Sequence, residues 1–422
     1  MEGLLADLHV HTGRARGRPV KVTASARLTV DAALCEARCR KGLQVIGLAD
    51  CLAGPVLAEL RLREESGDLS TAPGGGLIAA ASSPPRSRGG LLLVPGCEVE
   101  LLVYGTPVHF LVYLPDLAAC ESLRTALAPR MRNPDLGCQR AHGLGPAELA
   151  SLAHEFGGVF GLAHAFTPHR GYFGGTGRGL GDLFGGGTGA GCSVDFVEMG
   201  LSADVSMASL LGELAGVPLL ASSDAHGTAT IAREATLLQV ERASFQELKH
   251  ALAGQRGRTI RAYYGLDPRL GKYHRSACKA CGWTAAAGDP ATLECPVCGE
   301  SRRVVPGVLD RILVLAGAWG ATGHGSSSRA ERPPYHHQVP LSFLPGVGRV
   351  ARDKLLVRFG SEIAVLHRVP QADLALCAGE AAAGIIVAAR RGELSLSAGG
   401  GGTFGRASAA PRVPPPGPPV SR

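Results

Sequence analysis

Asp7-Leu8-His9-Val10-His11, near the amino terminus, closes a short apolar run. Successive side chains of a β-strand point to opposite faces, so His9 and His11, two residues apart, project to the same side. Two imidazoles on one side of a strand end form a chelating pair. The sequence therefore predicts a metal site at the end of a first, buried strand.

The same chemistry returns at Ser223-Asp224-Ala225-His226, which directly follows the apolar run from Val217 to Ala221. Between these two segments, more acids and histidines lie in or just after apolar runs, at Asp50, Glu98, His109 and His164. Such repetition at strand ends predicts a polynuclear metal site. Taken singly, His109 or His164 fits a hydrogen-bonded core histidine and Asp50 fits a helix cap. The motifs at Asp7 to His11 and Ser223 to His226 favour a metal site over these structural roles.

Length and composition limit the class of protein. The 422 residues can form a barrel-sized domain and one or two small ones. The sequence contains no run of about 18 apolar residues and no basic stretch before an apolar core, so we expect neither a membrane span nor a signal peptide. The 12 cysteines divide into scattered singles and one tight cluster. This distribution predicts a reduced, cytoplasmic protein with no membrane partner.

Basic residues are concentrated in the last third of the chain. Residues 300–422 contain 15 Lys and Arg against 8 Asp and Glu, which accounts for the whole formal net charge of +7. Residues 1–299 carry 28 of each sign. A basic region joined to a metal-binding region predicts that one holds a polyanion and the other processes it.

Patterning divides the chain into four segments. Over residues 1–262, apolar β-like runs alternate with helical patterns, as in an α/β barrel. Two glycine-rich stretches, 67–90 and 171–191, are expected to be flexible insertions over its mouth, the second a candidate substrate lid. We expect a zinc ribbon over 263–305, a basic helical DNA-binding domain over 306–398 and a disordered Gly/Pro-rich tail over 399–422.

The zinc ribbon is predicted from a C-x2-C-x13-C-x2-C motif formed by Cys278, Cys281, Cys295 and Cys298. A glycine follows each pair and allows the turn that aims both thiolates at one tetrahedral ion. Four protein ligands leave no open position, so this one zinc is expected to be structural. A redox role is disfavoured because two copies occur at zinc-ribbon spacing.

The basic helical segment opens with Leu344-Pro345-Gly346-Val347-Gly348, a turn that leads into a helical pattern. Glycines at such a turn let backbone amides at a helix N-terminus approach a phosphate. This pattern resembles one helix-hairpin-helix element, with candidate DNA-binding residues Gly346, Gly348, Arg349, Arg352 and Lys354. By itself a G-x-G is usually only a turn. No nucleotide-binding G-x4-G-K-[ST] motif occurs.

The first two thirds of the chain resemble the PHP (polymerase and histidinol phosphatase) superfamily. Within it, the chain resembles the endonuclease Q family over nearly its whole length. The residues that carry this likeness are Gly96-Cys97-Glu98-Val99-Glu100, Ala163-His164-Ala165-Phe166-Thr167-Pro168, Val194 to Ser202, Ser223-Asp224-Ala225-His226, Gly271-Lys272-Tyr273-His274-Arg275 and Arg332-Pro333-Pro334-Tyr335.

The resemblance implies an α/β fold: a PHP-type distorted (β/α)7 barrel with a small zinc ribbon and a C-terminal helix-hairpin-helix-like domain. It implies two or three divalent ions (Zn, Mg or Mn) on His9, His11, Asp50, Glu98, His109, His164, Asp224 and His226. Among these, Asp224 and His226 are expected to be catalytic, because an acid beside a histidine at the last strand end can bind both metal and the attacking water. Phe166 and His169, which stands where the family pattern has an aromatic residue, are the candidate lesion pocket.

The implied activity is DNA repair. A metal-dependent phosphodiesterase of this family nicks damaged duplex DNA 5′ of uracil, hypoxanthine, xanthine or an abasic site, which it reads by flipping the nucleotide. A DNA sliding clamp is a further candidate partner. The alternatives are a PHP-type phosphatase for a small phosphomonoester, in which the ribbon and basic third have no obvious use, and a non-catalytic DNA-binding protein, against which the full set of candidate ligands argues.

Overall fold

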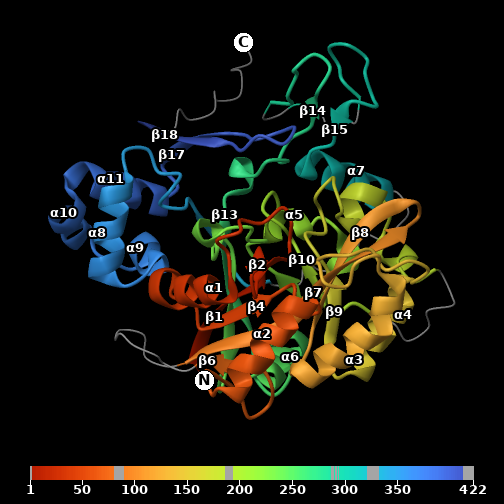
Figure 1. The fold of residues 1–422 in the computed structure, drawn as a ribbon. Helices are drawn as coiled ribbons and strands as arrows, with labels where there is room; N and C mark the ends of the chain where they lie inside the picture. The colour runs from red at the N-terminus through yellow and green to blue at the C-terminus, as the bar shows by residue number, and fades with distance from the viewer. Residues whose placement is uncertain are drawn as a thin grey trace.

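A single curled sheet organises the amino-terminal two thirds of the computed structural model (Figure 1). The structure describes residues 2–79, 90–185, 193–286, 289, 292, 294–320 and 332–411. In spatial order, the strands of the curl are β11 (Leu219–Leu220), β10 (Phe196–Glu198), β9 (Val159–Leu162), β8 (Thr106–Tyr113), β7 (Leu91–Val103), β4 (Val45–Leu48) and β1 (Glu2–Val10). The sheet continues through β12 (Ala235–Val240), β13 (Thr259–Leu266) and β16 (Tyr335–Gln338).

Among the described strands of the curl, β8 alone runs in the opposite direction. Strands β1, β4 and β7 are parallel to one another, as are β9, β10 and β11, whereas β8 is antiparallel to both of its neighbours. The two ends of the curl meet where Ala225, after β11, pairs with Val10 of β1. Two backbone hydrogen bonds of 3.0 Å hold this bridge, from the His11 amide to the Ala225 carbonyl and from the Ala225 amide to the His9 carbonyl. The predicted α/β class is confirmed as a curled half-barrel.

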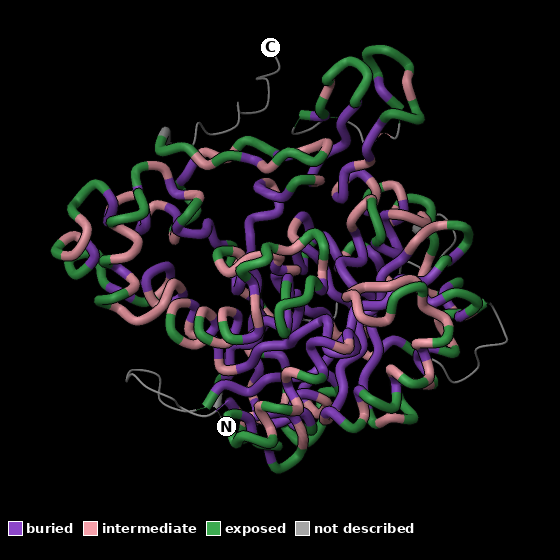
Figure 2. Tube along the Cα trace, in the orientation of Figure 1, coloured by how far each residue is buried: buried purple, intermediate pink, exposed green. Residues whose placement is uncertain are grey.

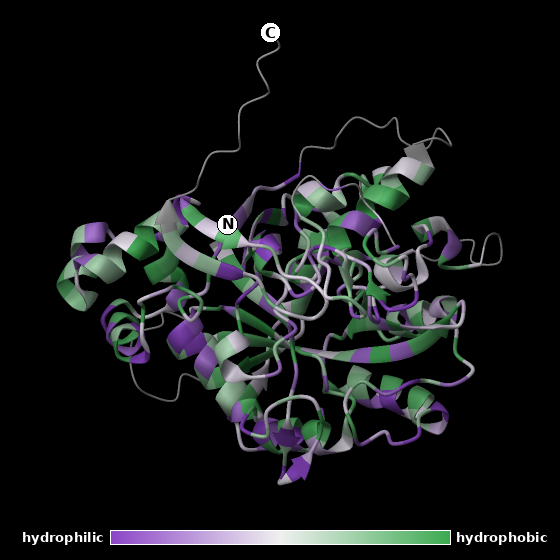
Figure 3. Ribbon diagram, turned by 90° about the horizontal axis from the view of Figure 1, so that it is seen from above, coloured by the Kyte–Doolittle hydropathy of each residue, from purple (hydrophilic) through white to green (hydrophobic). Residues whose placement is uncertain are grey.

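Helices cover the outside of the sheet, and the strands between them are buried (Figures 1 and 2). Several of these helices begin at a side-chain cap, such as Thr29, Asp116 or Ser244, whose oxygen accepts a backbone N–H of the first turn. The helices are α1 (Val30–Glu36), α2 (Gly54–Glu65), α3 (Leu117–Leu127), α4 (Pro146–Glu155), α5 (Val205–Ala208) and α6 (Phe245–Ala253). Seen from above, the central strands are mostly hydrophobic (Figure 3).

Short strands and helical turns lie between the main elements. They are β2 (Arg14–Ala15), β3 (Arg18–Pro19), β5 (Leu69–Thr71), β6 (Leu77–Ala79), η1 (Ala37–Lys41), η2 (Ala128–Arg130), η3 (Tyr172–Thr176), η4 (Leu180–Asp182), η5 (Gly212–Leu214), η6 (Thr228–Thr230) and η7 (Pro268–Leu270). The glycine-rich stretch 67–90, predicted to be flexible, thus contains a strand pair, and β6 also pairs with β7. Parts of both predicted insertions, residues 80–89 and 186–191, lie outside the described residues.

Part of the carboxyl-terminal third returns to the barrel. Helix α7 (Val308–Gly320) buries Val308, Ile312 and Leu315 in the same hydrophobic cluster as the barrel strands. Strand β16 pairs in parallel with β13. Residues after 306 therefore contribute to the barrel core as well as to the helical region, because their apolar side chains complete its hydrophobic surface.

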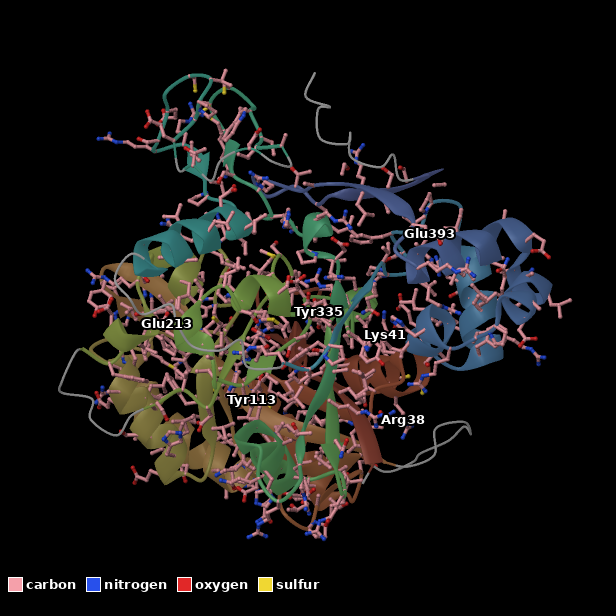
Figure 4. All side chains as sticks on the ribbon, turned by 180° about the vertical axis from the view of Figure 1, so that it is seen from behind. Arg38, Lys41, Tyr113, Glu213, Tyr335 and Glu393 are labelled. Atoms are coloured by element: carbon pink, nitrogen blue, oxygen red, sulfur yellow. The ribbon has the colours of Figure 1, made fainter. Side chains whose placement is uncertain are left out.

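Four helices form a second core beside the barrel: α8 (Arg349–Phe359), α9 (Glu362–His367), α10 (Gln371–Ala378) and α11 (Glu380–Arg390) (Figure 1). Lys41 of the barrel lies between the two units (Figure 4). Its ammonium contacts the Glu362 carboxylate and donates to the Ala229 carbonyl at 3.1 Å. The Arg40 guanidinium donates to Asp353 at 2.8 Å. Charged contacts thus hold the helices against α1 and η1.

The zinc-ribbon segment contains β14 (Ala277–Cys278) paired with β15 (Val304–Val305). Farther along the chain, β17 (Leu394–Ser397) pairs with β18 (Arg406–Pro411). The sequence predicts disorder from Gly399 onward, but residues 399–411 are folded: residues 406–411 pair with β17, and the Gly399 and Gly405 amides donate to the Arg269 and Leu270 carbonyls. Residues 412–422 lie outside the described part of the chain. No helix among the described residues is both long and apolar enough to cross a membrane.

Candidate metal centre and active site

The first group of candidate ligands lies where β1 ends. His9 and His11 are fully buried, with 3.3 Å between their Nε2 atoms. The bridge between Val10 and Ala225 brings Asp224 beside them, with its Oδ1 3.6 Å from His9 Nε2 and 3.3 Å from His11 Nε2. Asp224 has a φ of 45°, a left-handed conformation that costs energy in a non-glycine residue and often marks a functional site.

A second group surrounds Glu98, which lies inside β7. Its Oε1 is 2.6 Å from His109 Nδ1 of β8 and 3.1 Å from His164 Nε2, which follows β9. Its Oε2 is 3.5 Å from His11 Nε2 and accepts a 2.8 Å hydrogen bond from Lys21 Nζ. The Glu98 carboxylate therefore stands between the two groups, where a bridging ligand of two metal ions belongs.

The imidazole nitrogens and carboxylate oxygens of this site are suited to bind divalent cations. His9 Nδ1 lies 3.0 Å from Glu198 and His11 Nδ1 lies 3.0 Å from Asp50, so each Nδ1 is placed to carry a proton. Both Nε2 atoms then present lone pairs toward Asp224 Oδ1, a buried oxygen without a hydrogen-bond partner. Three acceptors that face one another repel unless a positive charge lies between them, and imidazole with carboxylate suits divalent transition metals.

The pKa values of the site residues are shifted by their charged neighbours. Burial alone would lower the pKa of His9, but the carboxylates of Glu198 and Asp224 outweigh it and raise the pKa to about 10, so a cation that binds Nε2 must displace its proton. Burial would raise the pKa of Asp224, yet the neighbouring histidines hold that pKa well below its usual range. The pKa of Glu98 is likewise held well below its usual range, against burial, by His109 and Lys21. The centre thus holds negative carboxylates that attract cations.

Six of the eight predicted ligands converge in these two groups: His9, His11, Glu98, His109, His164 and Asp224. Asp50 lies behind His11, where its Oδ2 also accepts the Thr12 amide at 2.7 Å. His226 is partly exposed, with its Nδ1 3.0 Å from the Asp224 carbonyl oxygen and its ring centroid 4.6 Å from that of His11. Asp50 is placed to orient His11, and His226 borders the open side of the site.

Several residues near the centre were not among the predicted ligands. Glu198 ends the apolar strand β10, as the predicted ligands end theirs, and its Oε2 accepts the His164 amide at 2.8 Å as well as contacting His9. The Glu100 carboxylate contacts Arg140 and Arg170. Burial would raise the pKa of Glu100, but His109, Arg140 and Arg170 lower it to about 2. Arg140 and Arg170 come from loops, which carry no periodic signal.

The two residues predicted to line a lesion pocket differ in exposure. Phe166 is 1% exposed and stacks on Phe173 with ring centroids 5.3 Å apart. His169 is exposed and meets the Tyr273 ring edge-on at 5.4 Å. Burial, helped by the positive charges of Lys279 and Arg170, lowers the pKa of His169. Phe166 therefore supports this loop from inside, whereas His169 faces outward near the ribbon.

The four ribbon cysteines come together as their spacing predicts. Their sulfur atoms all lie within 4.8 Å of one another, including 3.7 Å between Cys278 and Cys298 and 3.5 Å between Cys281 and Cys295. Gly282 and Gly299 both have positive φ angles, 79° and 68°, which the two knuckle turns require. The geometry fits one tetrahedral zinc ion.

The predicted phosphate-binding hairpin lies at the start of α8. Gly348 caps this helix, Gly346 adopts a φ of 78°, and the Arg349 side chain is 88% exposed. Lys354 is exposed and Arg352 is half-buried. Asp353 lies 3.8 Å from Arg349 and 2.8 Å from Arg40, so its carboxylate offsets part of the local positive charge.

Relatives by sequence span the same length. No family model matches the chain. It is 40% identical over 410 residues to the uncharacterized protein YqxK of Bacillus subtilis, which covers 96% of this chain and 99% of that protein. It is 33% identical over 237 residues to the uncharacterized protein MJ0043 of Methanocaldococcus jannaschii, which covers 52% of this chain and 29% of that protein.

Similarity to solved structures identifies the family of this chain. The lesion-specific endonuclease PfuEndoQ from Pyrococcus furiosus matches with a TM-score of 0.77 at 29% identity, over 96% of this chain and 95% of that one. Endonuclease Q in complex with a 27-mer duplex that has an abasic lesion at the active site matches with a TM-score of 0.78 at 30% identity, over 96% of both chains. Since this relationship extends across the barrel, ribbon and helical region alike, the chain belongs to the endonuclease Q family.

Proposed function

We propose that this protein is a metal-dependent DNA repair endonuclease that hydrolyses the phosphodiester 5′ of a deaminated base or an abasic site. The main supporting observation is the match over 96% of the chain to endonuclease Q in complex with an abasic-site duplex, together with the cluster formed by His9, His11, Glu98 and Asp224. A phosphatase for small substrates would not need the ribbon and helical units that this match includes.

The chain's own residues prepare the site. Glu98 lies between the two ligand groups and would hold two ions, while Lys21 fixes its Oε2 through a 2.8 Å hydrogen bond. Divalent ions bound there supply an activated water and neutralise charge on the phosphate. Asp224, whose side chain is 29% exposed, is the first-group ligand that reaches the open side of the site. It is therefore placed to contact both an ion and the scissile phosphate.

Recognition would be divided between the two ends of the molecule. A lesion inside a duplex is reached by flipping the nucleotide, which costs less for a mispaired or missing base. His169 and Tyr273, at the exposed edge between barrel and ribbon, are the candidate contacts for the flipped nucleotide. Arg349, Arg352 and Lys354 on α8 would grip the backbone, which positions DNA without reading its sequence.

The test is a nicking assay with full-length protein and end-labelled duplexes that carry uracil, hypoxanthine, an abasic site or no lesion, in Mg²⁺, Mn²⁺ or Zn²⁺. We expect a single nick 5′ of each lesion and none in the undamaged duplex. Asp224→Asn should lower nicking by at least about 100-fold, the scale of a lost electrostatic group in an active site. DNA affinity should stay close to that of the wild type.

Two outcomes would count against the proposal. Hydrolysis of p-nitrophenyl phosphate without any lesion-dependent nick would assign the site to phosphomonoesters. Binding of lesion duplex with no cleavage in any of the three metals would assign the protein a non-catalytic role.

A further inference from the structure

Cys138 is a thiol beside the second ligand group that the proposed mechanism leaves unused. Its Sγ lies 3.4 Å from His109 Nε2 and 3.8 Å from His109 Nδ1. Ligand atoms of Glu98, His109 and Cys138 all lie within 4.8 Å of one another. In a tetrahedral zinc site, bond lengths of about 2.0–2.3 Å place neighbouring ligand atoms about 3.3–3.8 Å apart, so the contact between Cys138 Sγ and His109 Nε2 has the length expected within one ion's ligand shell.

The backbone around Cys138 is built to bring the thiol there. Cys138 has a φ of 51°, a conformation that a non-glycine residue adopts at an energetic cost. Gly137 packs so tightly on Asp50 that an added Cβ would lie 2.0 Å from Asp50 Oδ1. The Gly137 amide donates to the Val20 carbonyl at 3.2 Å, and the Glu100 amide donates to the Gln139 carbonyl at 3.1 Å. Backbone contacts on both sides of Cys138 therefore hold it over the centre.

A hydrogen bond to His109 alone would not require the Cys138 backbone to be held so firmly. A thiol is a weak hydrogen-bond partner, whereas a thiolate is a strong ligand for soft cations. Glu98 and His109 already have partners among the other ligands, at 3.1 Å from Glu98 Oε1 to His164 Nε2 and at 3.3 Å from His109 Nδ1 to the same atom. A cation there would have nitrogen, carboxylate and sulfur donors together.

We propose that Cys138 is a thiolate ligand of the ion held by Glu98 and His109, and that it makes this position selective for zinc or another thiophilic metal over magnesium. The inference rests on the proposed metal-dependent function and deepens it by naming the metal class. Carboxylate and water suit Mg²⁺, whereas a cysteine ligand selects softer ions. Metal binding releases the thiol proton to solvent and forms one metal–sulfur bond, without any oxidant.

The first test is site-resolved alkylation of the full-length protein. The chelated protein, and the same protein with Zn²⁺ or with Mg²⁺, is treated with iodoacetamide, and each cysteine peptide is quantified by mass spectrometry. Zn²⁺ should slow modification of Cys138 at least about tenfold and Mg²⁺ should not, because only a thiophilic ion binds the thiolate. Cys377, which is half-buried in α10 and outside the metal groups, is the internal control.

The second test follows Co²⁺ as a spectroscopic stand-in for zinc. Wild type, Cys138→Ser and the matched control Cys377→Ser are loaded with Co²⁺, and the thiolate-to-cobalt absorption is measured. The ribbon contributes four thiolates in every variant. Cys138→Ser should therefore lose about one fifth of the absorption, whereas Cys377→Ser should lose none, if five thiolates bind in the wild type.

Loss of the ligand should also weaken zinc binding in the barrel by at least about 10- to 100-fold, the cost seen for residues that only support a ligand. The proposal is overturned if Cys138 is alkylated equally with and without Zn²⁺, or if Cys138→Ser retains the full cobalt–thiolate absorption. These readouts do not depend on nicking. Zinc protection of Cys138 in a protein that cleaves no DNA would refute the proposed function and leave this ligand in place.

Discussion

Glu198→Gln tests the metal centre most directly. It replaces one buried carboxylate oxygen by an NH2 group and leaves the predicted ligands intact. Glu198 contacts His9 Nδ1 at 3.0 Å and accepts the His164 amide at 2.8 Å, so one carboxylate orients a ligand in each group. A glutamine has the same shape but only one acceptor oxygen. Oε2 makes both of these contacts, so the amide oxygen of glutamine takes that position and the NH2 replaces Oε1. The NH2 then lies 3.1 Å from His9 Nδ1, where two donors repel each other.

The size of the effect follows from this geometry. A partner that orients a metal-binding histidine typically contributes 10- to 100-fold to metal affinity. We therefore expect Kd for the barrel ions to rise about 10- to 100-fold, which corresponds to about 1.4–2.8 kcal/mol. Loss of the negative charge adds to the effect because a carboxylate partner increases the basicity of the ligating imidazole.

The assay is a calorimetric titration of chelated protein with Zn²⁺ or Mn²⁺, with thermal unfolding as a check on the fold. Glu213→Gln is the control: Glu213 is half-buried and, like the fully buried Glu198, accepts a backbone amide, that of Leu180 at 2.8 Å, but it lies on the opposite flank of the barrel from the helical unit (Figure 4). The control should bind metal as the wild type does. An unchanged Kd in Glu198→Gln would refute the orienting role.

Three further predictions concern the other units. Cys278→Ser should lower the zinc content by one ion per chain and increase hydrogen exchange in the ribbon while the barrel stays folded, since a structural zinc contributes folding energy directly; unchanged zinc content would contradict this. Replacing Arg349, Arg352 and Lys354 together by Ala should flatten the slope of log K against log salt by up to about 2.7 and weaken lesion and undamaged duplex alike, and loss of lesion preference alone would contradict a backbone grip. Burial and nearby positive charge lower the pKa of His367 from 6.5 to about 4, so the folded state holds it neutral and loses stability as pH falls below 6.5. Between pH 8 and pH 5 the wild type should lose up to about 2 kcal/mol more than His367→Gln in urea unfolding, and equal losses would contradict the assignment.

The His367 contact also bears on how the helical unit stays attached to the barrel. Its Nε2 lies 3.0 Å from Gln338 Oε1 on β16, and its ring meets Tyr264 of β13 edge-on at 4.9 Å. A protonated ring would place a charge in this contact beside Arg390. Acid should therefore loosen α9 from β16.

Features of this protein that depend on local spacing can be read from the amino-acid sequence. Alternation along a strand places His9 and His11 on one face, and the two C-x2-C pairs bring four sulfurs within 4.8 Å of one another. Apolar runs ending in acids or histidines also predicted the α/β fold and six residues that converge in the centre. The α/β class is confirmed, and the placement of these side chains follows from strand period and knuckle geometry, which are properties of a few consecutive residues.

Residues that reach the centre from distant segments are placed there by long-range contacts. Asp50 follows a strand as the other candidates do, yet the pairing of β4 with β1 places it behind His11. Lys21 and Cys138 come from loops with no period, and their positions depend on backbone contacts such as that between Gly137 and Val20. The tail after Gly399 is composed like a disordered segment but pairs with β17. Contacts between residues distant in sequence settle these positions, and local composition carries no record of them.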